Sequence, residues 1–314
     1  MKENVWNFQN YYLPLHPCKK NNCKFANKKM KKNIALLLGL VLGLGFVSCS
    51  SDDDDDEYTN GEGKYLAEML TTRYEWKNGK RSDEGVPYQI TRYDKEGRTI
   101  SFEYLYDGWR RDFTYDENGD KKEEIFYDEN NNITSTYQYE YNYVDSYMVR
   151  YCYNWKNQLV KTEKSEYSNN EQRIRFTEII DSIGKVYGQV CTYSYSGNTI
   201  TTNVTLLDGS FLQKIVHEVD SHGNVTKTTS TSRDGQTGTV EYENEYDSKG
   251  RILKRTSHSD DGRVNYGYTE YTYNDDGTVK KTHTVNVYNP TPGVSNAERK
   301  EEFDLEYTYK YKKK

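Results

Sequence analysis

The chain has 314 residues, 29% of them charged, with a formal net charge of −6 at pH 7 and 32 tyrosines. Only 34% of the residues are hydrophobic, and Leu, Ile and Phe are sparse, so the chain lacks the aliphatic side chains for a thick two-layer core. The acidic balance and the lack of a basic face argue against a nucleic-acid partner. The lysine-rich end, residues 310–314, is interpreted as a charged guard on an edge strand.

The N-terminal region contains a targeting signal. Residues 1–29 are polar and irregular, whereas Met30-Lys31-Lys32-Asn33 begins a charged segment and residues 34–47 form an apolar run. That run is too short for an ordinary transmembrane helix but is typical of a signal peptide. We therefore expect residues 1–29 to be a mis-annotated leader, with Met30 as the true start, and residues 30–48 to be a lipoprotein signal peptide.

The signal ends in Phe46-Val47-Ser48-Cys49. A small residue followed by Cys resembles a bacterial lipobox, which implies cleavage before Cys49 and lipidation of that residue. The alternative is an ordinary secretory signal with a coincidental Cys. Eight Lys or Arg and one acidic residue precede Cys49, which leaves a mature net charge of −13.

An acidic run follows the predicted lipidation site. Ser50-Ser51 is followed by five Asp and then Glu57, and a block of like charge stays extended and disordered. Residues 49–63 are therefore predicted to be a lipidated Cys and an acidic disordered tether. Cys-Ser-Ser with an acidic run also resembles the surface-export signal of Bacteroidetes lipoproteins, which implies an outer-membrane protein exposed on the cell surface. A simple solvated spacer is the alternative.

Residues 64–314 are predicted to form one β domain built on a recurring turn, Tyr-Asp/Asn-x-x-Gly-polar-aliphatic. The Asp or Asn side chain accepts backbone N–H groups just ahead of it, and Gly supplies the positive φ of a tight hairpin loop. Full copies begin at Tyr93, Tyr115, Tyr246 and Tyr273, and Val219 begins a variant copy. The turn positions are Gly79, Gly97, Gly108, Gly119, Asn131, Asp145, Asn157, Asn170, Gly184, Gly197, Gly209, Gly223, Gly235, Gly250, Gly262, Gly277 and Pro290-Thr291-Pro292-Gly293.

Between these turns the sequence alternates with period two. Tyr137, Tyr139, Tyr141 and Tyr143 alternate with polar residues, as in a half-buried antiparallel strand. The pattern predicts an all-β fold: an antiparallel meander of about seventeen strands forming a curved or coiled sheet, held by Tyr and Thr ladders. Whether the sheet is open or closed is left undecided by the sequence.

The Tyr-Asp-x-x-Gly unit resembles the YD (RHS-type) repeat over about residues 88–281. That family forms long β-hairpin arrays in bacterial surface and secreted proteins. The resemblance implies a YD-repeat-like architecture and little about activity. Its largest members wind into shells around a toxin domain, but this array is too short for that role to be transferred.

Candidate catalytic and metal sites are weak. No nucleophile elbow, phosphate loop, dinucleotide fingerprint or zinc spacing occurs, so we expect no enzyme activity, no catalytic residues, no cofactor and no metal. His217 and His222 flank a turn and are interpreted as surface histidines. The Asp116 and Asp128 loops lack the Gly and Glu positions of a calcium loop.

Three tryptophans lie close to turns on one predicted edge of the sheet. They either cap the sheet ends or form an aromatic binding rim that stacks on sugars or on a partner. They are Trp76, Trp109 and Trp155, beside the turns at Gly79, Gly108 and Asn157.

Two cysteines remain beyond the predicted anchor. Cys152 and Cys191 are expected about three strands apart, roughly 14 Å at 4.8 Å per strand, whereas a disulfide requires Cα atoms within about 7 Å. We therefore expect two free, packed thiols. Cys18 and Cys23 fall within the predicted leader.

The sequence thus predicts a lipid-anchored, non-catalytic surface protein that presents a Tyr-rich acidic sheet to a glycan, a host protein or an envelope component. A periplasm-facing scaffold lipoprotein is the alternative, and a glycan-active enzyme comes third.

Overall fold

The computed structural model describes residues 63–168, 172–182, 185–259, 264–288 and 299–313. The expected leader, signal peptide, Cys49 and almost all of the tether lie outside these residues, as do the turn positions Asn170, Gly184, Gly262 and residues 290–293. Within the described ranges the secondary structure is entirely β. They contain no helix with the length and apolar character needed to cross a membrane.

The strands follow one another along the chain with short turns between them. They are β1 (Lys64–Lys77), β2 (Lys80–Arg81), β3 (Val86–Tyr93), β4 (Thr99–Tyr104), β5 (Arg110–Tyr115), β6 (Lys121–Tyr127), β7 (Ile133–Asn142), β8 (Tyr147–Asn154), β9 (Leu159–Tyr167), β10 (Arg173–Ser182), β11 (Lys185–Ser196), β12 (Thr199–Leu206), β13 (Phe211–Val219), β14 (Val225–Ser232), β15 (Thr237–Tyr246), β16 (Ile252–Ser259), β17 (Val264–Tyr273), β18 (Val279–Tyr288) and β19 (Arg299–Lys313).

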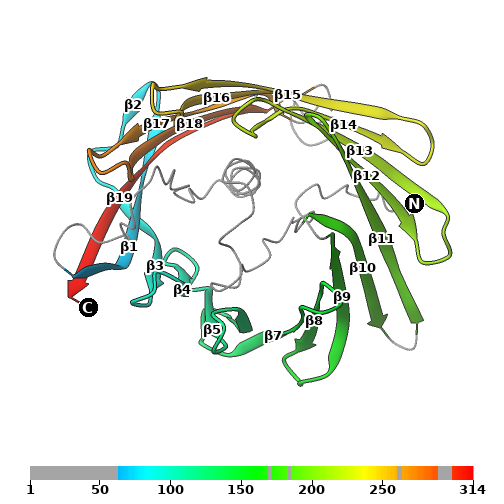
Figure 1. The fold of residues 1–314 in the computed structure, drawn as a ribbon. Coiled ribbons are helices and arrows are strands. Elements are labelled where there is room, and N and C mark those ends of the chain that lie inside the picture. Colours follow the sequence, from blue (N-terminus) through cyan, green and yellow to red (C-terminus); the bar gives the residue numbers. More distant parts are fainter. Residues whose placement is uncertain (1–62, 169–171, 183–184, 260–263, 289–298, 314) are drawn as a thin grey trace.

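The sheet is closed. From β3 to β19 each strand pairs antiparallel with the next, and β1 pairs with β3 on one side and with β19 on the other. Eighteen strands therefore form a barrel wall, while β2 pairs only with the last two residues of β1. Figure 1 shows this ring, with β1 in blue beside β19 in red.

This architecture confirms the predicted antiparallel meander, corrects the number of strands and settles whether the sheet is closed. The predicted number of about seventeen strands is wrong, because seventeen turns separate eighteen strands and the turn at Gly79 adds the short strand β2. The sequence left open or closed undecided, and the structure shows a closed barrel in place of an open curved sheet, because the outer edges of the first and last strands pair with each other over Lys64–Glu75 and Phe303–Lys313.

The predicted turn chemistry is confirmed. The Asp94 carboxylate accepts the backbone N–H groups of Glu96 and Arg98 at 3.0 and 2.8 Å, and Asp247 repeats the pattern with Lys249 and Arg251 at 2.9 Å each. Gly97 and Gly250 have φ values of 78° and 76°, a left-handed conformation that glycine adopts without a Cβ clash. Each unit is thus a closed Asx turn.

Neighbouring turn units also contact each other. Arg98 pairs with Asp94 at 2.7 Å, and its guanidinium lies 4.6 Å from the ring centre of Tyr115 in the next unit. The Tyr115 hydroxyl donates to the Thr99 carbonyl at 2.6 Å. Arg251 and Tyr273 repeat this arrangement. The Arg251 guanidinium lies 4.3 Å from the ring centre of Tyr273, and the Tyr273 hydroxyl donates to the Ile252 carbonyl at 2.7 Å. The repeat therefore links one hairpin to the next at this end of the barrel.

The two faces of the wall differ in burial. Directly paired residues on neighbouring strands lie on the same face of the wall and form rows that run around it. On one face most residues of these rows are buried, and we take this face as the inward, concave one. One such row contains Ser165, Phe176, Cys191, Val204 and Gln213, of which Ser165, Cys191 and Val204 are 0% exposed.

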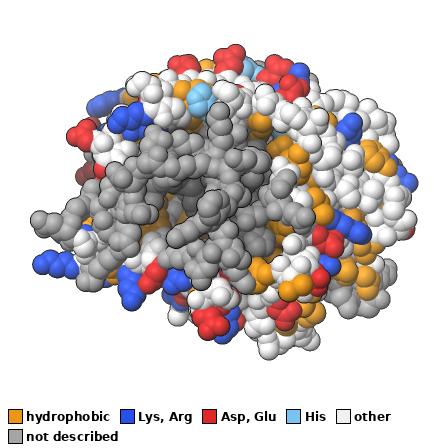
Figure 2. Space-filling view, in the orientation of Figure 1, with side chains coloured by type: hydrophobic (Ala, Val, Ile, Leu, Met, Phe, Trp, Pro, Cys, Tyr) orange, Lys and Arg blue, Asp and Glu red, His pale blue; other side chains and the backbone are white. Residues whose placement is uncertain are grey.

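The outward face carries exposed charged side chains on several strands. In β15 the alternate residues Glu241, Glu243 and Glu245 are exposed, and cross-strand ion pairs join Lys227 to Glu241 at 3.0 Å and Lys254 to Glu270 at 2.9 Å. Figure 2 shows acidic and basic side chains along the outer contour of the wall. The outer surface is therefore suited to contact with water.

The Tyr-rich row of β7 lies on the inward face. Tyr137 is paired with buried Cys152, and Tyr139 hydrogen-bonds to buried Glu124 at 2.6 Å. The predicted presentation of a Tyr-rich sheet to an external ligand is therefore wrong for this strand.

The two described cysteines are free and buried, as expected. Cys152 lies on β8 and Cys191 on β11, three strands apart. Burial raises the pKa of each thiol to about 11.

Closure predicts a specific crosslink. Leu70 on β1 and Thr308 on β19 are directly paired, which places their Cα atoms about 4.5–5.5 Å apart and within disulfide range. We expect the Leu70→Cys/Thr308→Cys variant to form an intramolecular disulfide on mild oxidation, detected as a crosslinked peptide by mass spectrometry. The control, Leu70→Cys/Thr239→Cys, should not crosslink. Equal crosslinking of both pairs, or of neither, would contradict a closed wall.

Candidate binding sites on the barrel

The inward face carries a chain of ion pairs across β5–β10. Glu124 accepts a hydrogen bond from the Tyr139 hydroxyl at 2.6 Å and pairs with Arg111 at 3.1 Å and with Lys121 at 3.5 Å. Burial favours the protonated acid, but the nearby charges of Lys121 and Arg111 and the Tyr139 hydrogen bond hold the pKa of Glu124 below its usual range. Glu124 is therefore ionised at neutral pH and is not a general acid there.

The chain continues through Glu163. This buried carboxylate pairs with Arg150 and, at 2.7 Å, with Lys161, which also reaches Glu178 at 3.2 Å. Burial opposes the charge of Lys161, but its bonds to the two carboxylates raise its pKa. These charges satisfy one another and join adjacent strands, which favours a structural role for the network.

A second cluster lies on the outward face at the closure seam. Asp304 of β19 is completely buried although its strand neighbours on this face are polar. Its Oδ1 accepts the Trp76 indole N–H at 3.0 Å and lies 2.7 Å from His283 Nδ1. Its Oδ2 forms ion pairs with Arg81 Nε at 3.1 Å and Lys281 Nζ at 2.7 Å. We call Trp76, Arg81, Lys281, His283 and Asp304 the seam cluster.

The seam cluster attaches the β1–β2 hairpin to the outer wall. The Arg81 guanidinium lies 3.7 Å from the Tyr74 ring centre and pairs with Glu306 at 2.5 Å, while Trp76 packs edge-on against His283 at 5.2 Å. Burial disfavours ionised Asp304, but hydrogen bonds from Lys281, His283 and Trp76 keep its pKa below the ordinary value of 3.8. The cluster joins β1, β2, β18 and β19.

The three tryptophans singled out in the sequence are near turns at one end of the barrel, but they are not equivalent. Trp76 donates its indole N–H within the seam cluster, whereas Trp109 and Trp155 are 45% and 68% exposed. Trp109 lies in the β4–β5 turn and Trp155 in the β8–β9 turn. These two turns are four strand spacings, or ~19 Å, apart along the wall. The structure brings no two of them into contact in the part that it describes.

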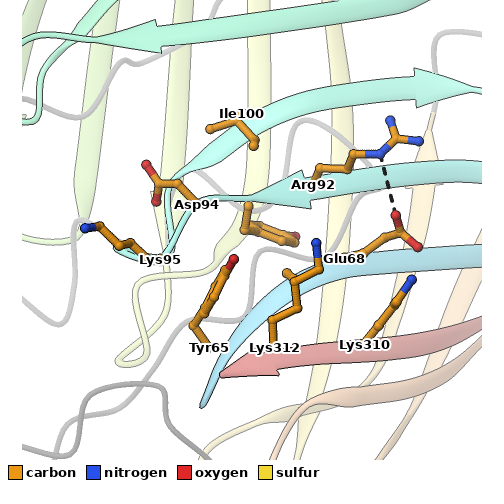
Figure 3. A pocket seen from close by; sticks show the side chains of 10 residues that line it. Tyr65, Glu68, Arg92, Asp94, Lys95, Ile100, Lys310 and Lys312 are labelled. Atoms are coloured by element: carbon orange, nitrogen blue, oxygen red, sulfur yellow. Dashed lines mark ion pairs between the residues drawn. The ribbon is translucent and has the colours of Figure 1, made fainter. Parts of the chain in front are cut away.

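A pocket of about 390 Å³ lies at the other end of the barrel, where β1, β19 and the β3–β4 turn meet. Figure 3 shows Tyr65, Lys95, Lys310 and Lys312 around it, with Arg92 and Glu68 joined by an ion pair. The other lining residues are Ala67, Tyr93, Asp94 and Ile100. We call this site the seam-end pocket.

In the seam-end pocket the acidic side chains are paired with arginines, whereas the lysines have few acidic partners. Arg92 is shared between Glu68 at 3.5 Å and Glu103 at 3.0 Å, and Asp94 is paired with Arg98. Lys310 and Lys312 are exposed on β19, and Lys95 has only a 3.8 Å contact with Glu96. The pocket therefore favours an anion.

This pocket also corrects a sequence interpretation. The sequence predicts that the lysine-rich end, residues 310–314, guards an edge strand, but β19 is paired on both sides, with β18 and β1. The grouping with Lys95 and Arg92, more than 200 residues away, depends on closure, which the sequence left undecided. The alternation of Lys and Tyr from Tyr307 to Lys312 is the signal that places these lysines on one face.

Metal-ligating residues are dispersed in the described ranges. No three His, Cys, Asp or Glu side chains there are grouped to hold a metal ion. His217 hydrogen-bonds to Thr228 at 3.0 Å, and His222 stacks on Tyr246 with ring centres 4.0 Å apart.

Comparisons with known proteins give structural similarities alone. No family model matches the chain, and no curated protein matches it either. A porin-like protein from Bacteroides uniformis ATCC 8492 is 13% identical with a TM-score of 0.42, covering 78% of this chain and 96% of that one. A porin-like protein from Bacteroides vulgatus ATCC 8482 is 12% identical with a TM-score of 0.31, covering 77% and 98%.

A third similar structure is the complex TcdB2-TccC3-Cdc42, at 11% identity and a TM-score of 0.30. The match covers 70% of this chain but only 16% of that chain. At these identities and TM-scores no family membership follows, and the resemblance to YD repeats rests on the turn units themselves.

The seam cluster predicts a stability effect. Asp304→Asn removes the buried carboxylate that Arg81 and Lys281 share, and because these two side chains are 31% exposed and remain solvated, the cost is that of lost charged hydrogen bonds, about 1.5–3 kcal/mol. We expect the free energy of unfolding at pH 7, measured by urea denaturation, to fall by about that amount. The exposed substitution Asp83→Asn should change it by less than ~0.5 kcal/mol.

The same residue predicts a pH dependence. Because the folded pKa of Asp304 is lowered, its stabilisation is fully present above the unfolded pKa and is lost as the pH falls through the folded value. The stability difference between wild type and Asp304→Asn should shrink below about pH 4. A difference that stays constant down to the acid transition would contradict this assignment.

Proposed function

We propose that the chain is a lipid-anchored, non-catalytic β-barrel of the bacterial outer membrane, whose wall stands in water and is exposed at the cell surface. The observation that carries this proposal is the polar outward face of the wall. It is combined with the lipobox-like sequence that ends at Cys49.

The outward face argues against a lipid-embedded wall. A membrane-spanning barrel carries an outward apolar band about 25 Å tall, and a charged residue at its midplane costs roughly 2–4 kcal/mol for Lys or Arg. Here exposed charges occupy the middle of outward rows, such as Glu243 in β15 and Lys214 in β13. A lipid on Cys49 would attach such a barrel to the membrane without burying these charges.

The direction of the chain gives the barrel a polarity. β1 begins at Lys64, at the end that also carries the turns at Gly97, Gly119, Gly223, Gly250 and Gly277. With the tether leaving from Lys64, the turns that hold Trp109 and Trp155 point away from the membrane. These exposed rings are the groups we propose for contact with a glycan, a host protein or an envelope component.

A periplasm-facing scaffold is the second candidate, because the polar wall and the lipid anchor suit either side of the outer membrane. A glycan-active enzyme is third, since the carboxylates of the inward network are paired with cations. The orientation of the anchor separates the first two candidates.

Attachment and orientation can be tested in cells of the source bacterium. We expect the wild-type protein to carry lipid on Cys49 and to be digested by protease added to intact cells, while a periplasmic marker survives. Replacing residues 30–49 by a cleavable secretory signal without a lipobox should release the barrel in soluble form. Recovery of this variant in the membrane fraction, extractable only by detergent, would instead support a membrane-embedded wall. Protection of the wild type until lysis would support the scaffold.

Ligand contact through the exposed tryptophans has a separate test. Once a glycan array or crosslinking to envelope extracts has identified a ligand, Trp109→Ala/Trp155→Ala should weaken its binding by about tenfold or more, since each stacked ring contributes roughly 0.5–1.5 kcal/mol. The matched control is Tyr106→Ala, an exposed aromatic on the same β4–β5 turn, which should change binding less. Unchanged affinity of the double variant would exclude the aromatic rim.

A further inference from the structure

The seam-end pocket has a composition that the proposed barrel function does not explain. It combines three lysines with two tyrosines at one corner of a chain that is acidic overall. We infer that this pocket binds the phosphate groups of anionic lipid headgroups, so that the seam end of the barrel docks on the membrane surface. The inference rests on the proposed lipid anchor.

The charge of the pocket supports a phosphate ligand. Lys310 and Lys312 lie on the same outward face of β19, two residues apart, and Lys95 lines the opposite rim of the pocket from the β3–β4 turn (Figure 3). The acidic residues of the pocket are already engaged, Glu68 with Arg92 and Asp94 with Arg98. An entering phosphate therefore meets lysines that have few competing carboxylates.

The aromatic residues fit the same surface. Tyr65 lies between Lys95 and Lys312 in Figure 3, and Tyr93 also lines the pocket. Tyrosine is enriched at the headgroup level of membranes, where its ring contacts lipid and its hydroxyl contacts water. A volume of about 390 Å³ is within the range of pockets that hold small ligands.

The position of the pocket in the chain makes this ligand locally abundant. Tyr65 is one residue beyond Lys64, where β1 begins. The stretch from Cys49 to Lys64, which the sequence predicts to be an extended acidic tether, spans fifteen residues and reaches at most about 50 Å. A lipid on Cys49 would therefore hold the pocket within a few nanometres of the headgroups, and binding there would be effectively intramolecular.

The test uses the predicted mature chain from Ser50 to Lys314, without the signal peptide and Cys49, so that binding depends on neither the apolar signal nor the attached lipid. Sedimentation with vesicles of phosphatidylglycerol and phosphatidylcholine, at low salt, should pull down the protein, and vesicles of phosphatidylcholine alone should not. Because each lysine near an anionic surface contributes about fivefold, Lys310→Ser/Lys312→Ser should weaken binding by roughly 30-fold. The control, Lys80→Ser/Lys156→Ser, removes two exposed lysines at the opposite end and should bind like the parent.

Three outcomes would overturn the inference. They are equal binding to both kinds of vesicle, equal loss in the two double variants, and pocket-dependent binding of inorganic phosphate in calorimetry without any binding to vesicles. The last would identify a soluble phosphate compound as the ligand. Matching melting temperatures confirm that the variants are folded. Because the protein lacks Cys49, failure here leaves the anchoring proposal untouched, and failure of the anchor in cells is observed separately.

Discussion

The structure depends on the pairing of its first and last strands. Lys64–Glu75 of β1 and Phe303–Lys313 of β19 satisfy each other's backbone groups, so the wall has no free edge. The seam cluster strengthens this junction, because Asp304 on β19 is enclosed by donors from β1, β2 and β18. The seam-end pocket and the common position of both chain ends are consequences of the same closure.

The wall is stable without a large aliphatic core because its interactions are spread along every strand pair. Small residues such as Ser165 and Cys191 fill the inward face between tyrosines, and buried carboxylates such as Glu124 and Glu163 are each held by at least two partners. A buried charge is tolerated when it is paired and hydrogen-bonded. This explains how a chain with so few hydrophobic residues forms a single ordered sheet.

Local chemistry was predictable from the sequence, and long-range geometry was not. The Asx turns at Asp94 and Asp247, the alternation in β7 and the separation of Cys152 from Cys191 follow from short-range rules of turn and strand geometry. Closure was not predictable, because no pattern in residues 64–77 or 299–313 states that these two strands meet.

For the candidate binding residues, too, local features were predictable from the sequence and long-range contacts were not. The exposure of Trp109 and Trp155 is in keeping with their turns, but the role of Trp76 depends on Asp304, 228 residues away. The tyrosines were expected on a presented face, yet curvature turned that face inward, and period-two alternation by itself does not tell which side of a sheet becomes concave. Lys310 and Lys312 likewise lie beside Lys95 and Arg92 only because β19 pairs with β1.

An antiparallel ring closes only with an even number of strands, and this parity places the entry and exit of the chain at the same end. For a protein engineer the two ends of the barrel are therefore not interchangeable. Cargo fused after Lys313 would emerge beside Lys64, at the end of the barrel that carries the seam-end pocket. An insertion in the turns at Gly209 or Gly235 would emerge at the opposite end. Because Lys64 and Lys313 are directly paired, joining the barrel there and reopening the chain at one of those turns would move the two ends of the barrel's chain to the opposite end of the barrel.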